Sequence, residues 1–256
     1  MKKADSNKRK SLFFLVLFAI CLSFFNFSCG LDTITFLEDP FSVNDLPNVE
    51  SSFETCDFSF SVRKLDNPGE TGRAYIYYKI YNDDQKVSSE ESSLISKSED
   101  SSGKIYSFSY MRDTYGYKQL CYIKEGDTSF TTFDLLNDKS HNVKIRLTNY
   151  LDIEEYSASI SVDGKKVGVP VRMTGKTFDF GRKGENDENP MVSHSTENAS
   201  SGDTKGFLEK QDEGEENIFY VSMFGVFEQP DDNWDFNQSS IHFLGRVKID
   251  ANVLNN

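Results

Sequence analysis

The sequence predicts an all-β protein, an antiparallel β-sandwich interrupted by long polar loops. Short runs in which apolar and polar residues alternate recur from residue 56 onward, and this period of two is typical of strands with one buried face. Asp163-Gly164 separates two such runs, and this dipeptide favours a tight hairpin turn. Since no segment of the mature chain shows a sustained helical period, two stacked sheets are the expected way to enclose a core.

The predicted strands follow one another along the chain from residue 56. Those with the clearest alternation are residues 56–62, 73–81, 143–148, 156–162 and 241–249, and residues 165–171 form the return strand after the Asp163-Gly164 turn. Residues 218–228 are apolar on both faces, as in a central strand. β-branched and aromatic content predicts further strands at residues 104–111, 117–124 and 129–136.

Three tyrosines, Tyr75, Tyr77 and Tyr81, share the outward face of the strand at 73–81. Exposed tyrosines are enriched at binding surfaces. A second layer of structure over that face would instead bury them in an ordinary core. We expect the covering layer, because the long insertions must pack somewhere.

Two segments, 82–103 and 181–217, are rich in Ser, Asp, Glu and Gly. Neither carries enough apolar surface to offset the entropy lost on ordering, so both are predicted to be mobile loops. Residues 51–256 are predicted to form one sandwich domain around them. A sandwich module needs only about 100 residues, so two domains meeting near residue 140 are the alternative.

Residues 1–28 have the organisation of a secretory signal peptide. A basic stub at 1–10 precedes an apolar run at 11–27, and Cys29 follows at the expected cleavage edge, between Ser28 and Gly30. A cysteine there predicts lipid attachment through its thiol, with a further acyl chain such as palmitate on the freed amine.

Residues 29–50 are therefore predicted to be a lipidated N-terminus and tether. An uncleaved membrane anchor is the alternative, since the 17-residue, mainly apolar run falls at the short end of membrane-spanning lengths. Both arrangements export the chain after residue 30 and place it in the cell envelope.

Three segments resemble treponeme-type spirochaete lipoproteins. They are the Cys-Gly-Leu-Asp opening that leads to an Asp-Pro step at 29–40, the tyrosine-rich run at 77–82, and the aromatic strand, Asp/Asn loop and Ser-rich return at 220–245. The resemblance implies an envelope location and a lipid anchor, and it carries no established activity. The strands at 73–81, 218–228 and 240–250 also resemble strands C, F and G of a fibronectin type III or immunoglobulin-like sandwich.

The charge of the chain limits its partners. The whole sequence carries 28 Lys and Arg against 41 Asp and Glu, a formal charge of −13. Removal of residues 1–28 takes away five basic residues and one acidic residue, which leaves −17. Such a surface repels phosphate backbones, so nucleic-acid binding is not expected. It would attract divalent cations or basic partners, although most of this charge is expected only to solvate the surface.

Two cysteines, Cys56 and Cys121, remain after Cys21 leaves with the signal and Cys29 takes the lipid. An exported compartment permits a disulfide between them. Two separate buried thiols, acting as small apolar side chains, are the alternative, and the sequence does not give the Cα separation that would decide.

No catalytic, cofactor-binding or metal-binding residues are predicted. The three histidines, His141, His194 and His242, each stand alone, and the motifs of zinc hydrolases, α/β-hydrolases and thioredoxins are missing from the mature sequence. Residues 231–237 space their acidic and amide side chains like a calcium loop, but they lack its glycine and its glutamate. We interpret them as a solvated hairpin loop.

Together these features predict a lipid-anchored, exported protein that acts as a non-catalytic binding or structural module. Its partners would be the membrane, through the lipid, and an unknown protein or carbohydrate. A carbohydrate-active enzyme and a divalent-cation-binding protein, each built on a sandwich, are the alternatives.

Overall fold

The computed structural model describes residues 37–47, 57–65, 72–81, 83–147, 157–178, 218–230 and 236–250. Residues 36–256 form one compact unit. Within the described ranges, thirteen strands make two sheets in which every strand pair is antiparallel. The predicted β-rich antiparallel fold is confirmed at this level.

The first sheet, sheet 1, has seven strands. Their spatial order is β1 (Phe41–Asp45), β2 (Phe58–Val62), β8 (His141–Arg146), β9 (Ser159–Val162), β10 (Lys165–Val171), β5 (Cys121–Lys124) and β6 (Phe130–Thr132).

The second sheet, sheet 2, has the long strands β3 (Arg73–Tyr81) and β11 (Ile218–Pro230) at its centre. On the far side of β11 lie β13 (His242–Asp250) and β12 (Phe236–Gln238), and on the far side of β3 lie β4 (Lys118–Gln119) and β7 (Asp134–Leu136).

A single apolar core lies between the two sheets. Both sheets contribute the side chains that alternate inward along their strands, as a period of two requires. From sheet 1 these include Phe58, Phe60, Val143, Ile145 and Ile160, and from sheet 2 Ile76, Tyr78, Val221, Met223 and Val247. The sheets therefore face each other across this core.

One hairpin crosses from one sheet to the other. Its first leg runs from β4 in sheet 2 to β5 in sheet 1, and its second leg returns from β6 to β7. The buried residues Leu120 and Phe133 stand at the two crossing points, where the backbone N–H of Phe133 donates to the carbonyl of Leu120 at 2.8 Å. Each of the predicted strands at 117–124 and 129–136 is thus two short strands joined by a bend.

The predicted turn at Asp163-Gly164 is confirmed. Asp163 has φ of 53° and Gly164 has φ of 75°, so both central residues have the positive φ of the turn that suits a two-residue hairpin. β9 and β10 pair directly on either side of it.

The prediction of a mobile loop at 82–103 is wrong, because most of this segment is helix α2 (Asp84–Glu99). The side chain of Asp83 caps the helix by accepting from the backbone N–H of Lys86 at 3.0 Å. Only Val87 and Leu94 among its apolar residues are fully buried. The rest of the buried face is polar, which is why the sequence shows no apolar helical period.

The predicted strand at 104–111 is also wrong. A 3₁₀ turn (Lys104–Tyr106), the short helix α3 (Ser107–Ser109) and a π-helical turn (Tyr110–Thr114) occupy this stretch. Phe108 and Met111, three residues apart, are both buried on the side facing sheet 2. That spacing fits one face of a helix, although the aromatic content favoured a strand.

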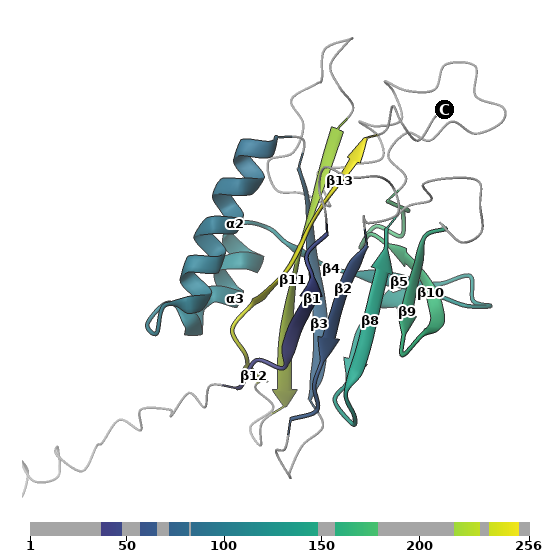
Figure 1. The fold of residues 1–256 in the computed structure, drawn as a ribbon, viewed down its shortest axis with the longest axis horizontal. Coiled ribbons are helices and arrows are strands. Elements are labelled where there is room, and N and C mark those ends of the chain that lie inside the picture. Colours follow the sequence, from purple (N-terminus) through teal and green to yellow (C-terminus); the bar gives the residue numbers. More distant parts are fainter. Residues whose placement is uncertain are drawn as a thin grey trace, which may run out of the picture. The chain divides into compact units, whose positions relative to one another are not determined.

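The predicted covering layer over the tyrosines is confirmed. α2 contacts β3, β11 and β13 of sheet 2 and lies beside α3 (Figure 1). Tyr77 and Tyr81 are 7% and 2% exposed, and they belong to a second apolar cluster with Val87, Leu94, Phe108, Met111, Phe224 and Val226.

The tether predicted at 29–50 is wrong for residues 37–47, which belong to the folded body. β1 pairs with β2, and Phe41 is 6% exposed. Its ring occupies the space beside Gly225, where a Cβ would lie 2.5 Å from the ring. The acidic residues and prolines around Leu37 and Phe41 hid these two core positions in the sequence.

Several predictions concern residues outside the described ranges. They are the signal peptide at 1–28, the lipidation of Cys29, the loop at 181–217, Cys56, His194 and residues 231–235. In the described ranges no helix has both the length and the apolar content to cross a membrane.

Candidate functional site

The outer face of sheet 1 carries small polar side chains and lysines in a regular array. We call Ser42, Ser59, Ser61, Asn142, Lys144, Ser159, Ser161 and Lys166 the serine–lysine face. One row crosses four adjacent strands through directly paired residues, in the order Ser59, Lys144, Ser161, Lys166. A second row runs from Ser42 through Ser61 to Asn142. These side chains share one face because their strand neighbours point into the core.

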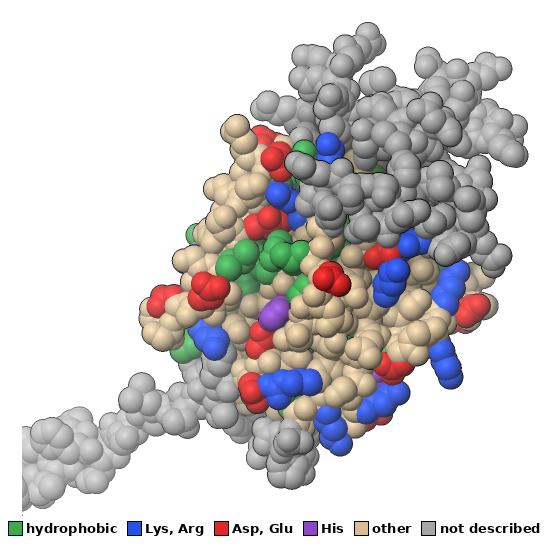
Figure 2. Space-filling view, in the orientation of Figure 1, with side chains coloured by type: hydrophobic (Ala, Val, Ile, Leu, Met, Phe, Trp, Pro, Cys, Tyr) green, Lys and Arg blue, Asp and Glu red, His purple; other side chains and the backbone are tan. Residues whose placement is uncertain are grey.

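The serine–lysine face is open to solvent. Asn142, Lys144 and Lys166 are exposed, and the serines of β2 and β9 are half-buried. Of the described helices, α2 contacts strands of sheet 2. Figure 2 views this side of the molecule and shows Lys and Arg side chains on it, with Asp and Glu side chains beside some of them.

A buried ion pair fixes one side of this face. The Nε and Nη2 atoms of Arg146 each lie 2.7 Å from an oxygen of Asp57, and both side chains are nearly buried. Such two-pronged pairing is strong and directional. The Nζ of Lys144 also lies 2.9 Å from Asp57. One carboxylate therefore contacts two cations.

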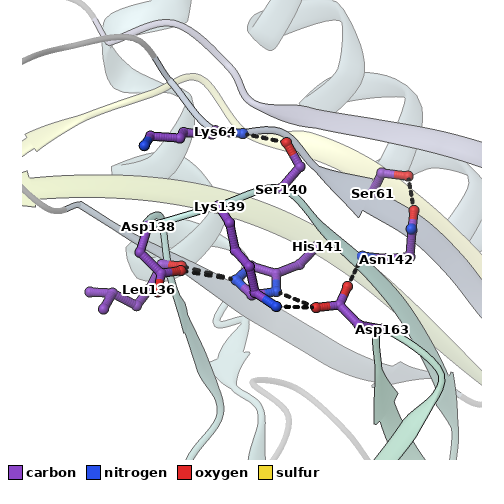
Figure 3. A network of polar contacts seen from close by, with 9 residues as sticks. All are labelled: Ser61, Lys64, Leu136, Asp138, Lys139, Ser140, His141, Asn142 and Asp163. Carbon is purple, nitrogen blue, oxygen red and sulfur yellow. Dashed lines mark hydrogen bonds and ion pairs between the residues drawn. The ribbon is translucent and has the colours of Figure 1, made fainter.

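A second polar cluster lies where the β7–β8 turn meets the β9–β10 turn (Figure 3). One oxygen of Asp163 accepts from the backbone N–H of Asn142 at 3.0 Å. The other lies 2.9 Å from Lys139 Nζ and 3.1 Å from His141 Nδ1. The Asn142 N–H, and then Lys139 and His141, hold the pKa of Asp163 well below its usual range. The cluster ties the two turns together.

The structure brings His141 together with Asp163, which is distant in the sequence, and with Asp138, which lies three residues before it. Figure 3 shows its ring between Asp163 on one side and Leu136 and Asp138 on the other. Its Nε2 lies 3.2 Å from the Leu136 carbonyl and 3.5 Å from Asp138 Oδ1. Because acceptors of the protein engage both ring nitrogens, neither is placed to take a proton from a substrate. No local pattern indicates the contact with Asp163, which follows His141 by 22 residues.

His242 also has a partner that the sequence did not indicate. Its Nδ1 lies 2.6 Å from Asp39 Oδ2, and its ring stacks on Phe41 at 5.9 Å between centroids. The contact joins the start of the described body to β13 in sheet 2.

Two lysines of the hairpin, Lys165 and Lys166, are exposed. Within the described part of the chain neither forms an ion pair. Lys166 belongs to the serine–lysine face, whereas Lys165 pairs with Val162 and points to the other side of the strand. Lys144 and Lys166 give the face lysine charges in a protein that is acidic as a whole. Lys144 and Lys166 stand two strands apart, a separation of about 10 Å at the usual strand spacing.

The outer face of sheet 2 holds a very different polar network beneath α2. Lys79 is 2% exposed, and its Nζ lies 2.6 Å from Oε2 of Glu90 on the helix. The hydroxyl of Tyr81 lies 2.8 Å from the same oxygen and 3.1 Å from the hydroxyl of Tyr117. Tyr117 in turn lies 3.2 Å from Ser222 Oγ. Burial raises the pKa of both tyrosines, so their hydroxyls keep their protons and act as hydrogen-bond donors.

No group of three or more His, Cys, Asp or Glu that could hold a metal ion occurs among the described residues. Cys121 is buried at the start of β5, and burial raises the pKa of its thiol. Three strands separate β5 from β2, the strand that follows Cys56. Because Cys56 lies outside the described ranges, its pairing with Cys121 stays a prediction.

No protein-family model, curated protein or solved structure matches this chain. The assignment of a function therefore depends on the residues and their geometry.

Proposed function

We propose that this protein is an exported, lipid-anchored, non-catalytic binding module of the cell envelope, and that the serine–lysine face is its binding surface. The observation that carries the proposal is the cross-strand row Ser59, Lys144, Ser161, Lys166 on a solvent-exposed sheet. Small side chains on a rigid sheet make a flat surface whose donors and acceptors need little reordering on binding.

The ligand class that fits this face best is an acidic polysaccharide with sparse charges. Serine hydroxyls and the Asn142 amide both donate and accept, as sugar hydroxyls do, and lysines pair with carboxylate or sulfate groups. Double-stranded DNA carries a negative charge every ~1.7 Å, far denser than lysines about 10 Å apart. That spacing is close to the length of a disaccharide unit.

The acidity of the whole protein is compatible with such a ligand. At physiological ionic strength, charges more than about 8 Å apart are largely screened. The lysines of the face therefore act locally, while carboxylates farther away than this distance contribute little to the contact. A membrane surface fits less well, because the face offers no bulky apolar side chain to insert between lipids.

The start of the folded body supports a position close to the membrane. Leu37 is 6% exposed and forms a bridge with Ser239, and it follows the proposed lipidated Cys29 by only eight residues. A fully extended chain of that length spans at most about 28 Å. The module would then act within that distance of the lipid.

The spatial order of the strands supports the finer assignment to an immunoglobulin-like sandwich. β1 and β2 would correspond to strands A and B, and β13, β11 and β3 to strands G, F and C. β8 and β9 take the positions of strands E and D, but in the reverse chain order, so the connection departs from that topology at this point. β10, β5 and β6 would then extend the A-B-E-D sheet, and α2 would be an insertion after strand C.

The binding proposal is tested with the full-length protein in detergent micelles and with polygalacturonate as the probe. We expect salt-sensitive binding, which Lys166→Glu weakens by about tenfold, the equivalent of 1.4 kcal/mol. Lys86→Glu makes the same kind of charge change on exposed α2 and serves as the matched control. Neutral dextran should bind in none of the variants.

Three results would contradict the binding proposal. The first is an absence of binding to polygalacturonate. The second is an equal loss of affinity in Lys86→Glu. The third is an affinity for polygalacturonate that does not change with the salt concentration. Release of reducing ends from the polymer would favour the carbohydrate-active alternative, and saturable heat on titration with calcium would favour the divalent-cation alternative.

The anchor is tested separately. In Cys29→Ala we expect the lipid mass to be missing from the mature protein and the protein to leave the membrane fraction, because several acyl chains together supply the membrane affinity. A wild-type residue 29 without lipid, or an unchanged membrane fraction in the variant, would contradict the anchor and leave the binding surface to be judged by its own test.

A further inference from the structure

Two neighbouring glutamates on α2 face sheet 2 and have different surroundings. Glu90 Oε2 receives Lys79 at 2.6 Å and Tyr81 at 2.8 Å. Glu91 is 7% exposed, and its Oε1 has no hydrogen-bond partner among the described residues. An ionised carboxylate needs several donors when it leaves water. Glu90 has them, and Glu91 does not.

The groups around Glu91 do not compensate a negative charge. From β11, Ser222 supplies one hydroxyl hydrogen bond. From β13, Arg246 Nη1 lies 3.7 Å from Glu91 Oε2, beyond hydrogen-bond distance.

The charge of that guanidinium is also shared with other residues of the helix. The same Nη1 lies 2.9 Å from Ser88 Oγ and 3.2 Å from Asp84 Oδ1, both on α2. The hydroxyl of Tyr117, in the segment before β4, is a further neighbour of Glu91. Burial, more than any of these contacts, raises the pKa of Glu91.

We infer that α2 is a proton-linked cover on sheet 2, held closed by the neutral form of Glu91 and loosened when this buried side chain loses its proton. Docked Glu91 binds its proton more tightly than Glu91 in water would. Docking of α2 is therefore firmest at low pH. It weakens as the pH rises from 4.5, the ordinary pKa of a glutamate, through the raised pKa of docked Glu91. This inference is independent of the lipid anchor and of the serine–lysine face.

Release of the helix would uncover an aromatic surface. Tyr77, Tyr81, Tyr117, Phe224 and Val226 form the second apolar cluster together with Val87 and Leu94 of α2. α2 buries only those two apolar side chains completely, and few buried apolar contacts favour local opening. The pH of the surroundings would thus set how often this surface is exposed.

The test is hydrogen exchange at the amides of α2 in the full-length protein, with the variants Glu91→Gln and Glu90→Gln. Each variant is compared with the wild type at the same pH, so that intrinsic exchange rates cancel. At about pH 8 we expect Glu91→Gln to slow exchange in α2, by up to about tenfold for each unit by which docking raises the pKa. At about pH 4 the difference should shrink. Glu90→Gln should speed exchange at both pH values, because it leaves Lys79 buried with a weaker partner.

Equal or faster exchange of α2 in Glu91→Gln at pH 8 would overturn the inference, and so would a difference that is the same at both pH values. Failure of Glu91→Gln to fold would also overturn it, since the amide resembles the neutral acid. Glu91→Met, which has similar volume and no charge, is the second variant and must slow exchange in the same direction.

Discussion

The outer faces of the two sheets belong to the same domain and carry different kinds of side chains. Sheet 1 presents serines, Asn142 and lysines to solvent, with its one buried ion pair at the side of the array. Sheet 2 presents tyrosines and Lys79, and α2 covers them. The difference teaches that side-chain size on the outward positions of a strand indicates which face is left open: small polar residues need no cover, whereas large aromatic ones do.

The largest expected effect comes from breaking the buried pair at the side of the open face. Asp57→Ala removes the carboxylate that forms a two-pronged pair with Arg146, whose side chain is 8% exposed, so we expect a loss of about 3–5 kcal/mol in the free energy of unfolding. Urea denaturation measures it. Lys144→Met removes only the exposed partner of Asp57 and should cost less than about 1 kcal/mol. Equal losses would mean that the pair is not buried in the way described.

A smaller loss is expected on the covered face. Tyr117→Phe removes a fully buried hydroxyl that lies between Tyr81 and Ser222. We expect a loss of about 1–2 kcal/mol in the free energy of unfolding, because both partners keep other contacts. Thermal or urea unfolding checks this. No loss would show that the hydroxyl network beneath α2 is solvated, and would remove the contrast between the two faces.

At the turn cluster of sheet 1 we expect a modest effect that depends on pH. The pKa of Asp163 is depressed, so its contribution to stability is present above the ordinary value of 3.8 and is lost as the pH falls below it. Asp163→Asn should therefore be less stable than the wild type at pH 7. The two unfolding curves should converge in strong acid. A difference that does not change with pH would contradict the role given to the carboxylate charge.

The smallest effect is expected at the centre of the open face. Ser161→Leu places a large apolar side chain between Lys144 and Lys166. If nothing covers this position, stability should change by no more than about 0.5 kcal/mol. A gain or a loss of several kcal/mol would indicate that another part of the protein packs on the serine–lysine face.

Much of this contrast could be predicted from the sequence. Ser59, Ser61 and Ser161 alternate with core residues, which placed them on an outward face, and the alternation of Tyr75, Tyr77 and Tyr81 predicted a covering layer. The identity of that layer could not be predicted. The face of α2 toward the sheet is made by Ser88, Glu90 and Glu91 as much as by Val87 and Leu94, so its polarity resembles that of a loop.

The clusters around the histidines were equally hidden. His141 meets Asp163 only because β8 and β9 are neighbours in the sheet, and His242 meets Asp39 across 203 positions of the chain. No local pattern records such contacts. The start of the body was missed for another reason: Leu37 and Phe41 are single apolar residues within acidic surroundings, and the slot for Phe41 is made by Gly225 on a distant strand.

Lysine acylation of the native full-length protein, read by mass spectrometry, tests the contrast between the faces most directly. We predict rapid modification of Lys144, Lys165 and Lys166 and protection of Lys79 until the protein unfolds, since Lys79 is 2% exposed and paired with Glu90. Lysines of sheet 1 that react as slowly as Lys79, or a Lys79 that reacts as fast as they do, would contradict the assignment of one open and one covered face.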